Sequence, residues 1–192
     1  MSDRATTLLE GRREKIERAL GRPLAFPAPA SGRDQSESER DHLRNSATDL
    51  YLNELAWENI TEEEQVEGEP LAELVFPGFL ALIQGLLLEQ VMPDSLAPAN
   101  PRPEIAEDVV RFLAERVVAL QDEMGGAGEG DAEQEARDLA LTDRLLDLVL
   151  FRLHGVDPAD VEGLQERSAG VLNVAPGEAP SAAPRRLPVP DG

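Results

Sequence analysis

Two glutamates one helical turn apart, Glu54 and Glu58, are the residues of this chain best spaced for chemistry. Carboxylates at positions i and i+4 lie on one face of a helix and can share a cation. Glu115 or Asp143, on other expected helices, could add an oxygen ligand from a facing helix. Helical di-iron sites use Glu-x-x-His on each of two helices, and this chain does not contain two such motifs. The two glutamates therefore predict either a carboxylate metal site or solvated side chains on a helix face.

The two histidines are expected to be structural. His154 precedes Gly155 at the end of a predicted helix, where a cation interacts well with the helix dipole and the last carbonyl groups. His42 is expected on the polar side of another helix. A Ser/His/acid triad would need a serine such as Ser46 beside a histidine, and no nucleophile-elbow motif supports one. The sequence thus predicts no catalytic residues.

Other common chemistries are excluded by residue type. The absence of cysteine removes thiolate nucleophiles and zinc–thiolate sites. The glycine-dense stretch 125–130 has neither the lysine of a P-loop nor a preceding strand, so it is expected to be a joint. No cofactor is expected.

The charge of the chain is strongly acidic. Thirty-eight Asp and Glu residues stand against 18 basic residues, of which Lys15 is the only lysine, and the formal net charge is −20. This argues against binding of nucleic acid or of an anionic membrane, because both require a basic face. The acidity could reflect a high-salt proteome, a soluble surface, or a face for a basic partner. In the last case Glu62, Glu63 and Glu64 would belong to an acidic mimic of nucleic acid.

The N-terminal region differs in charge from the next part of the chain. Residues 3–20 have apolar positions at helical spacing with basic residues between them, which predicts an amphipathic helix. Residues 1–35 carry a net charge of +2, whereas residues 36–73 carry −10. Pro and Gly residues make 21–35 a predicted linker. Residues 1–35 are therefore expected to form a loosely attached arm that could fold against an acidic body.

The rest of the chain predicts an all-α domain over residues 36–170, a bundle of about five helices. Helical patterns cover 36–59, 71–92, about 104–124, 131–154 and 157–169. Few aromatic residues and many Leu, Val and Ala favour helices over sheets. Residues 171–192 are rich in Pro and Ala and are expected to be a disordered tail.

The central segment, Leu74 to Met92, is apolar on nearly every side. It is too short and too interrupted to cross a membrane, so it is expected to be the central helix, covered by neighbours or by a partner. Leu80, Ile83, Leu87 and Leu88 are the candidate partner-binding residues. In the tail, Arg185, Arg186 and Leu187 combine charge, an apolar anchor and polyproline bias, as short docking peptides do.

The preferred functional hypothesis is a non-catalytic helical interaction module, an adaptor, regulator or assembly subunit. It is expected to bind a protein partner or to self-associate. No secretory signal follows Met1, so a cytoplasmic location is expected. The first alternative is a carboxylate-based metal-binding bundle or metal-dependent enzyme that uses Glu54 and Glu58, and the second is an acidic mimic that binds a basic partner.

Overall fold

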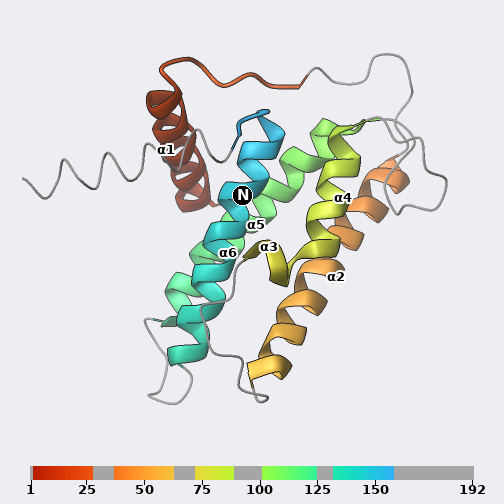
Figure 1. The fold of residues 1–192 in the computed structure, drawn as a ribbon, viewed down its shortest axis with the longest axis vertical. Coiled ribbons are helices and arrows are strands. Elements are labelled where there is room, and N and C mark those ends of the chain that lie inside the picture. Colours follow the sequence, from red (N-terminus) through yellow and green to blue (C-terminus); the bar gives the residue numbers. More distant parts are fainter. Residues whose placement is uncertain (1, 28–36, 63–71, 89–100, 125–131, 158–192) are drawn as a thin grey trace, which may run out of the picture.

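All regular secondary structure in the described residues is helical, so the predicted all-α fold class is confirmed (Figure 1). The computed structural model describes residues 2–27, 37–62, 72–88, 101–124 and 132–157, with the side chains of 58–62 left out. The helices in these ranges are α1 (Asp3–Leu20), α2 (Glu37–Glu62), α3 (Ala72–Val75), α4 (Pro77–Leu87), α5 (Pro103–Met124) and α6 (Ala132–Leu153).

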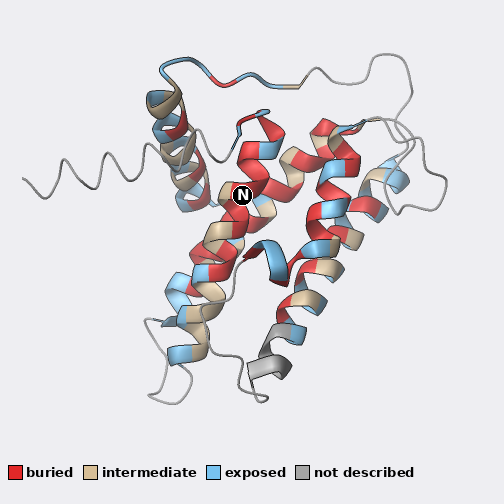
Figure 2. Ribbon diagram, in the orientation of Figure 1, coloured by how far each residue is buried: buried red, intermediate tan, exposed pale blue. Residues whose placement is uncertain are grey.

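Helices α5 and α6 form the centre of the fold. They lie side by side and run in opposite directions (Figure 1). Leucine and valine at helical spacing give each of them a wide buried face, as the sequence predicted. The buried faces of α4, α5 and α6 turn toward one another, and exposed residues lie on the outer sides (Figure 2).

An aromatic cluster joins α2 to α4 and α5. Tyr51 is fully buried, and its ring lies 5.7 Å from that of Phe76, 6.4 Å from that of Phe79 and 5.5 Å from that of Phe112. The Tyr51 hydroxyl is 2.8 Å from the hydroxyl of Thr142 on α6. The only tyrosine of the chain therefore ties α2 to α6 through a buried hydrogen bond.

The predicted central helix is shorter than expected within the described residues. The regular helix begins at Pro77, directly after the predicted start near Phe76, where the missing N–H of proline is harmless. Residues 72–75 form the separate turn α3. Leu80 and Ile83 point into the core, at 4% and 0% exposure, so the bundle itself covers most of α4.

Helix α1 packs on α5, so the basic arm does fold against the body. Ser2 caps its first turn, and Gly21 ends it with a φ of 66°, a left-handed conformation that favours glycine. Ala5, Leu9 and Ile16 are buried under the helix, so the attachment is apolar as well as ionic. The start of the predicted linker, residues 22–27, takes part too, because Leu24 is buried.

Several predictions concern residues outside those described. These include the joint at 125–130, most of the short helix at 157–169, the linker from residue 28, and the end of the central segment at 89–92. The side chains of Glu62, Glu63 and Glu64 and the tail with Arg185, Arg186 and Leu187 also lie outside the described residues. Within the described ranges, no helix is both long enough and apolar enough to span a membrane.

Candidate functional site

The first candidate metal ligand, Glu54, caps a neighbouring helix. Its carboxylate accepts hydrogen bonds from the backbone N–H groups of Gly78 (2.7 Å) and Phe79 (3.0 Å), in the first turn of α4. Phe76 lies at the N-cap position of α4, but its apolar side chain cannot accept a hydrogen bond from these N–H groups. Glu54 on α2 therefore supplies the cap that α4 lacks, and its negative charge suits the positive end of the helix.

The described candidate ligands form no metal cluster with Glu54. The side chain of Glu58 is outside the description, Asp143 pairs with Arg12 on α1, and Glu115 is exposed on α5. In the described ranges, no group of three or more His, Asp or Glu side chains is placed to hold a metal ion. The described geometry gives the metal hypothesis no support.

Glu39 and His42 have the spacing of a Glu-x-x-His motif, but they are not arranged as ligands. The Glu39 carboxylate lies 2.9 Å from Nη1 of Arg102, and His42 is exposed on α2. Arg102 is itself buried, with its Nε 2.5 Å from Glu104. Its backbone N–H donates to the carbonyl of Leu86, so this group links the start of α5 to the end of α4.

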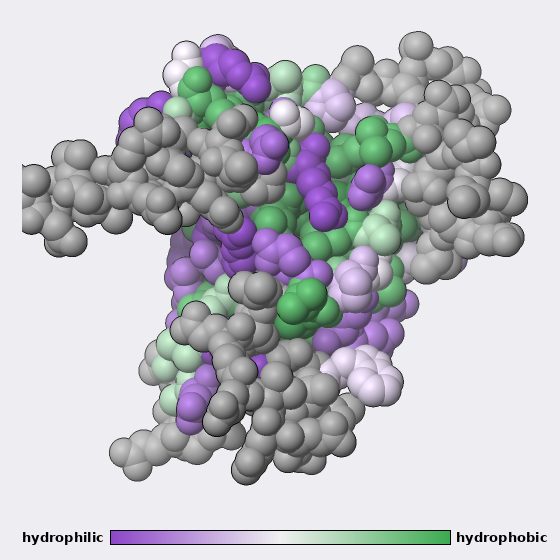
Figure 3. Space-filling model, viewed as in Figure 1, coloured by the Kyte–Doolittle hydropathy of each residue, from purple (hydrophilic) through white to green (hydrophobic). Residues whose placement is uncertain are grey.

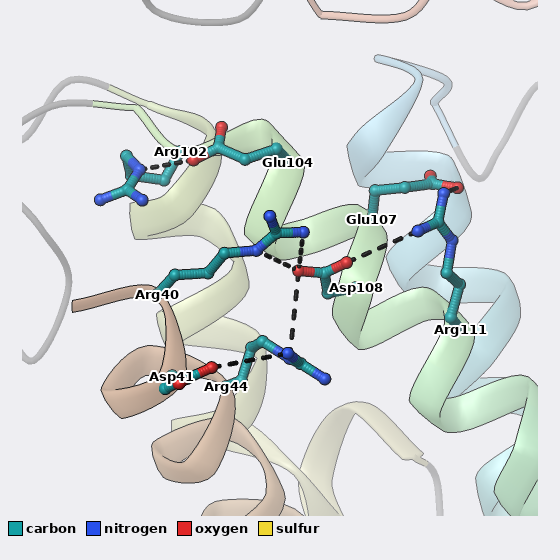
Figure 4. Close-up of polar contacts among 8 residues, drawn as sticks. All are labelled: Arg40, Asp41, Arg44, Arg102, Glu104, Glu107, Asp108 and Arg111. Carbon is teal, nitrogen blue, oxygen red and sulfur yellow. Dashed lines mark hydrogen bonds and ion pairs between the residues drawn. The ribbon is translucent and has the colours of Figure 1, made fainter. Parts of the chain in front are cut away.

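The densest charged cluster surrounds Asp108 on α5 (Figure 4). Arg40 donates from Nε at 2.7 Å, and Arg44 and Arg111 lie within 3.9 and 3.6 Å of the carboxylate. The Asp108 side chain is 9% exposed, and its hydrogen bond raises the pKa of Arg40. With both carboxylate oxygens engaged by guanidinium groups, Asp108 is placed to join α2 to α5 and not to act on a substrate.

His154 fastens the arm, which corrects the expectation of a cation at a helix end. It is 4% exposed, and burial lowers its pKa from the ordinary value of 6.5, which favours the neutral ring. Nε2 accepts a hydrogen bond from Nε of Arg13 (3.2 Å), which leaves Nδ1–H to donate to the carbonyl of Ala25 (2.8 Å). The ring of Phe26 meets the imidazole edge-on at 4.7 Å. Sequence spacing could not reveal these partners, which lie about 130 residues away.

Three arginines of α1 complete the attachment. Arg4 lies 2.6 Å from Asp122, and Arg13 lies 2.6 Å from Glu107, both on α5. Arg12 pairs with Asp143 and, at 2.5 Å, with Asp147 on α6. The charge reversal in the sequence concerned residues 36–73, whereas the carboxylates that pair with these arginines lie further along the chain, on α5 and α6. The positions of the individual partners required the fold.

The exposed side of α3 and α4 carries few charges. Helix α4 contains no charged residue, and Pro77, Ala81 and Gln84 form its exposed stripe. Leu74 and Leu88, at the two ends of this stripe, are 76% and 54% exposed. We call these five residues the α3–α4 face. Figure 3 shows hydrophobic side chains near α3 and between α4 and α6, with hydrophilic side chains among them.

Burial leaves few of the predicted partner-binding residues of this region on the surface. Leu80 and Ile83 are core residues, and Leu87 is half-buried against the core. Leu88, the C-cap residue of α4, is the one described candidate that is exposed, and Leu74 is exposed as well. Arg152 on α6 lies alongside and donates from Nη1 to the carbonyl of Leu80 at 2.8 Å.

Comparisons with known proteins add no assignment. No protein family, curated protein or solved structure matches the chain.

Proposed function

We propose that this chain is a non-catalytic, cytoplasmic protein-interaction module that binds a protein partner through the α3–α4 face. The observation that carries the proposal is the exposure of Leu74 and Leu88 on a helix pair without charged residues in α4, in a chain with 29% charged residues. Exposed apolar patches of this kind are typical of interaction surfaces. The five residues of this face carry no charge, and the exposed Glu73 beside Leu74 is already paired with Arg144, which keeps the cost of desolvation on binding low.

The polar residues support the same assignment. Glu54 caps α4, Asp108 holds three arginines, and His154 fastens the arm. Each of these groups is engaged in a contact between helices. This use of the strongest chemical candidates favours an interaction module over an enzyme.

The test compares two variants that add charge to exposed leucines. Leu74→Asp with Leu88→Asp alters the α3–α4 face, and Leu52→Asp alters a leucine on α2 that is about as exposed as Leu88. Each tagged chain is recovered from native lysate, co-purified proteins are quantified by mass spectrometry, and self-association is followed by sedimentation velocity. We expect a stoichiometric partner, or a dimer, to be lost from the double variant and retained by the control.

Three outcomes would count against the proposal. Equal recovery of the same partner by all chains would show that the α3–α4 face is not the interface. A monomer without partners would favour the metal alternative, which metal analysis of the same sample examines directly. Binding only to basic proteins, lost at high salt, would favour the acidic mimic.

A further inference from the structure

The attachment of α1 depends on side chains. In the described ranges, no backbone-to-backbone hydrogen bond joins residues 2–27 to the rest of the protein. The contacts are the three arginine pairings, the His154 bond to Ala25 and the buried apolar residues of the arm. Nine residues of sequence, 28–36, separate this segment from α2. Helix α1 is thus bound in the manner of a ligand that is tethered to its own receptor.

The surface under α1 combines apolar and acidic character. Apolar side chains of α5 and α6 form the core beneath it, and Asp122, Glu107, Asp143 and Asp147 face its arginines. Desolvation raises the pKa of Asp147, and the nearby guanidinium of Arg12 offsets only part of this effect. If α1 left, these carboxylates would lose their counter-charges next to apolar surface. The surface therefore requires a cationic, amphipathic occupant.

We infer that the surface of α5 and α6 beneath α1 is a docking site for a basic amphipathic helix of a partner protein, and that α1 is its displaceable internal occupant. Charge complementarity between the +2 arm and the acidic body selects this chemistry. This surface is distinct from the α3–α4 face, so the inference does not depend on the proposed function. In this arrangement the arm competes with the partner helix and so sets the partner concentration that is needed for binding.

The sequence of α1 specifies what a competing helix must carry. Ala5 and Leu9 are buried one turn apart, and Ile16 is buried two turns further on. Two adjacent arginines, Arg12 and Arg13, engage carboxylates on both α6 and α5. A partner helix with this apolar spacing and a central pair of basic residues would satisfy the site. Because α1 belongs to the same chain as its binding surface, its effective concentration there is on the order of a millimolar, so a free helix at micromolar concentration is normally excluded.

The experiment uses the full chain and a labelled peptide with the sequence of residues 2–27. Arg12→Glu in the full chain places a negative charge beside Asp143 and Asp147 and should release the arm. Lys15→Glu makes the same charge change on the exposed side of α1 and serves as the matched control. Peptide binding is measured by fluorescence anisotropy at 0.15 M NaCl, with helicity checked by circular dichroism.

We expect the Arg12→Glu chain to bind the peptide at least about tenfold more tightly than the wild type or Lys15→Glu, because only its docking site is vacant. A peptide that itself carries Arg12→Glu should not bind. The inference is overturned if a folded Arg12→Glu chain does not bind the peptide, binds it no more tightly than the control, or binds both peptides equally. If Arg12→Glu does not fold, Arg12→Ala removes the pairing without adding charge, and the same order of affinities is required.

Discussion

Replacing Glu54 with alanine tests whether this carboxylate is a helix cap. The change removes the acceptor for the N–H groups of Gly78 and Phe79, and Phe79 is fully buried. A capping side chain contributes about 1 kcal/mol, and hydrogen bonds to charged groups contribute about 1.5–3 kcal/mol each. Because Glu54 is only half-buried, we take about 1–1.5 kcal/mol for each of the two bonds.

The expected loss for Glu54→Ala is therefore about 2–3 kcal/mol in the free energy of unfolding. For a chain of this length, that corresponds to a fall in Tm of about 4–12 °C. Urea unfolding followed by circular dichroism measures the first quantity, and a thermal scan measures the second. Glu54→Gln keeps one acceptor oxygen but no charge, so about half of the loss is expected.

Asp49→Ala is the matched control, since it removes one carboxylate from the exposed side of the same helix. Its effect should stay within about 0.5 kcal/mol, as for most surface substitutions. If Glu54→Ala were as stable as Asp49→Ala, the capping argument would be refuted. If a divalent metal stabilised the wild type but not Glu54→Ala, the metal hypothesis would replace it.

Three further predictions concern Gly78, His154 and Asp108. A Cβ at Gly78 would lie 2.6 Å from Oε1 of Glu54. Gly78→Ala should therefore lower the free energy of unfolding by about 1–2 kcal/mol in the wild type and by less in Glu54→Ala. Additive losses in urea unfolding would contradict this. Burial lowers the pKa of His154, so as pH falls the unfolded chain binds a proton at this residue before the folded chain does, and the free energy of unfolding should decrease below pH 6.5. His154→Asn should make this decrease smaller in urea midpoints measured from pH 5.5 to 7.5. An unchanged pH dependence would refute the assignment. Asp108→Asn should lower the free energy of unfolding by about 2 kcal/mol, because it leaves three half-exposed guanidinium groups close together. The loss should be smaller at 0.5 M than at 0.05 M NaCl, and a loss independent of salt would argue against an electrostatic role.

The helices could be predicted because their patterns are local. In α5, Ile105, Val109, Leu113 and Val117 recur at four-residue intervals, and all of them are buried. The start of α4 followed from the conformational restriction of Pro77. The basic arm was expected to fold against an acidic body, and it does, but its ion pairs are with α5 and α6 and not with the acidic segment 36–73 that suggested the docking. These predictions required only residue types, spacing and long-range electrostatics.

The candidate site could not be predicted in the same way, because its contacts join distant parts of the chain. Glu54 meets Gly78 at a separation of 24 residues, and His154 meets Ala25 at 129. Spacing alone made Glu54 a metal candidate and His154 a cation at a helix end. The sequence does hold one usable signal: α4 begins after Phe76, which cannot cap it, so its first N–H groups need acceptors from elsewhere.

The borrowed cap of α4 has a consequence for how the chain folds. At 11 residues, α4 is shorter than the roughly 12–15 residues that an isolated helix needs to be even marginally stable in water. Its first turn is completed only when α2 is in place, so formation of α4 and docking of α2 must be one cooperative step. A fragment that starts after residue 62 would lose both the Glu54 cap of α4 and the packing of Tyr51 against Phe76 and Phe79, so α4 should be strongly destabilised in it. Any shortened version of this protein must retain α2, even if the surface of interest lies elsewhere.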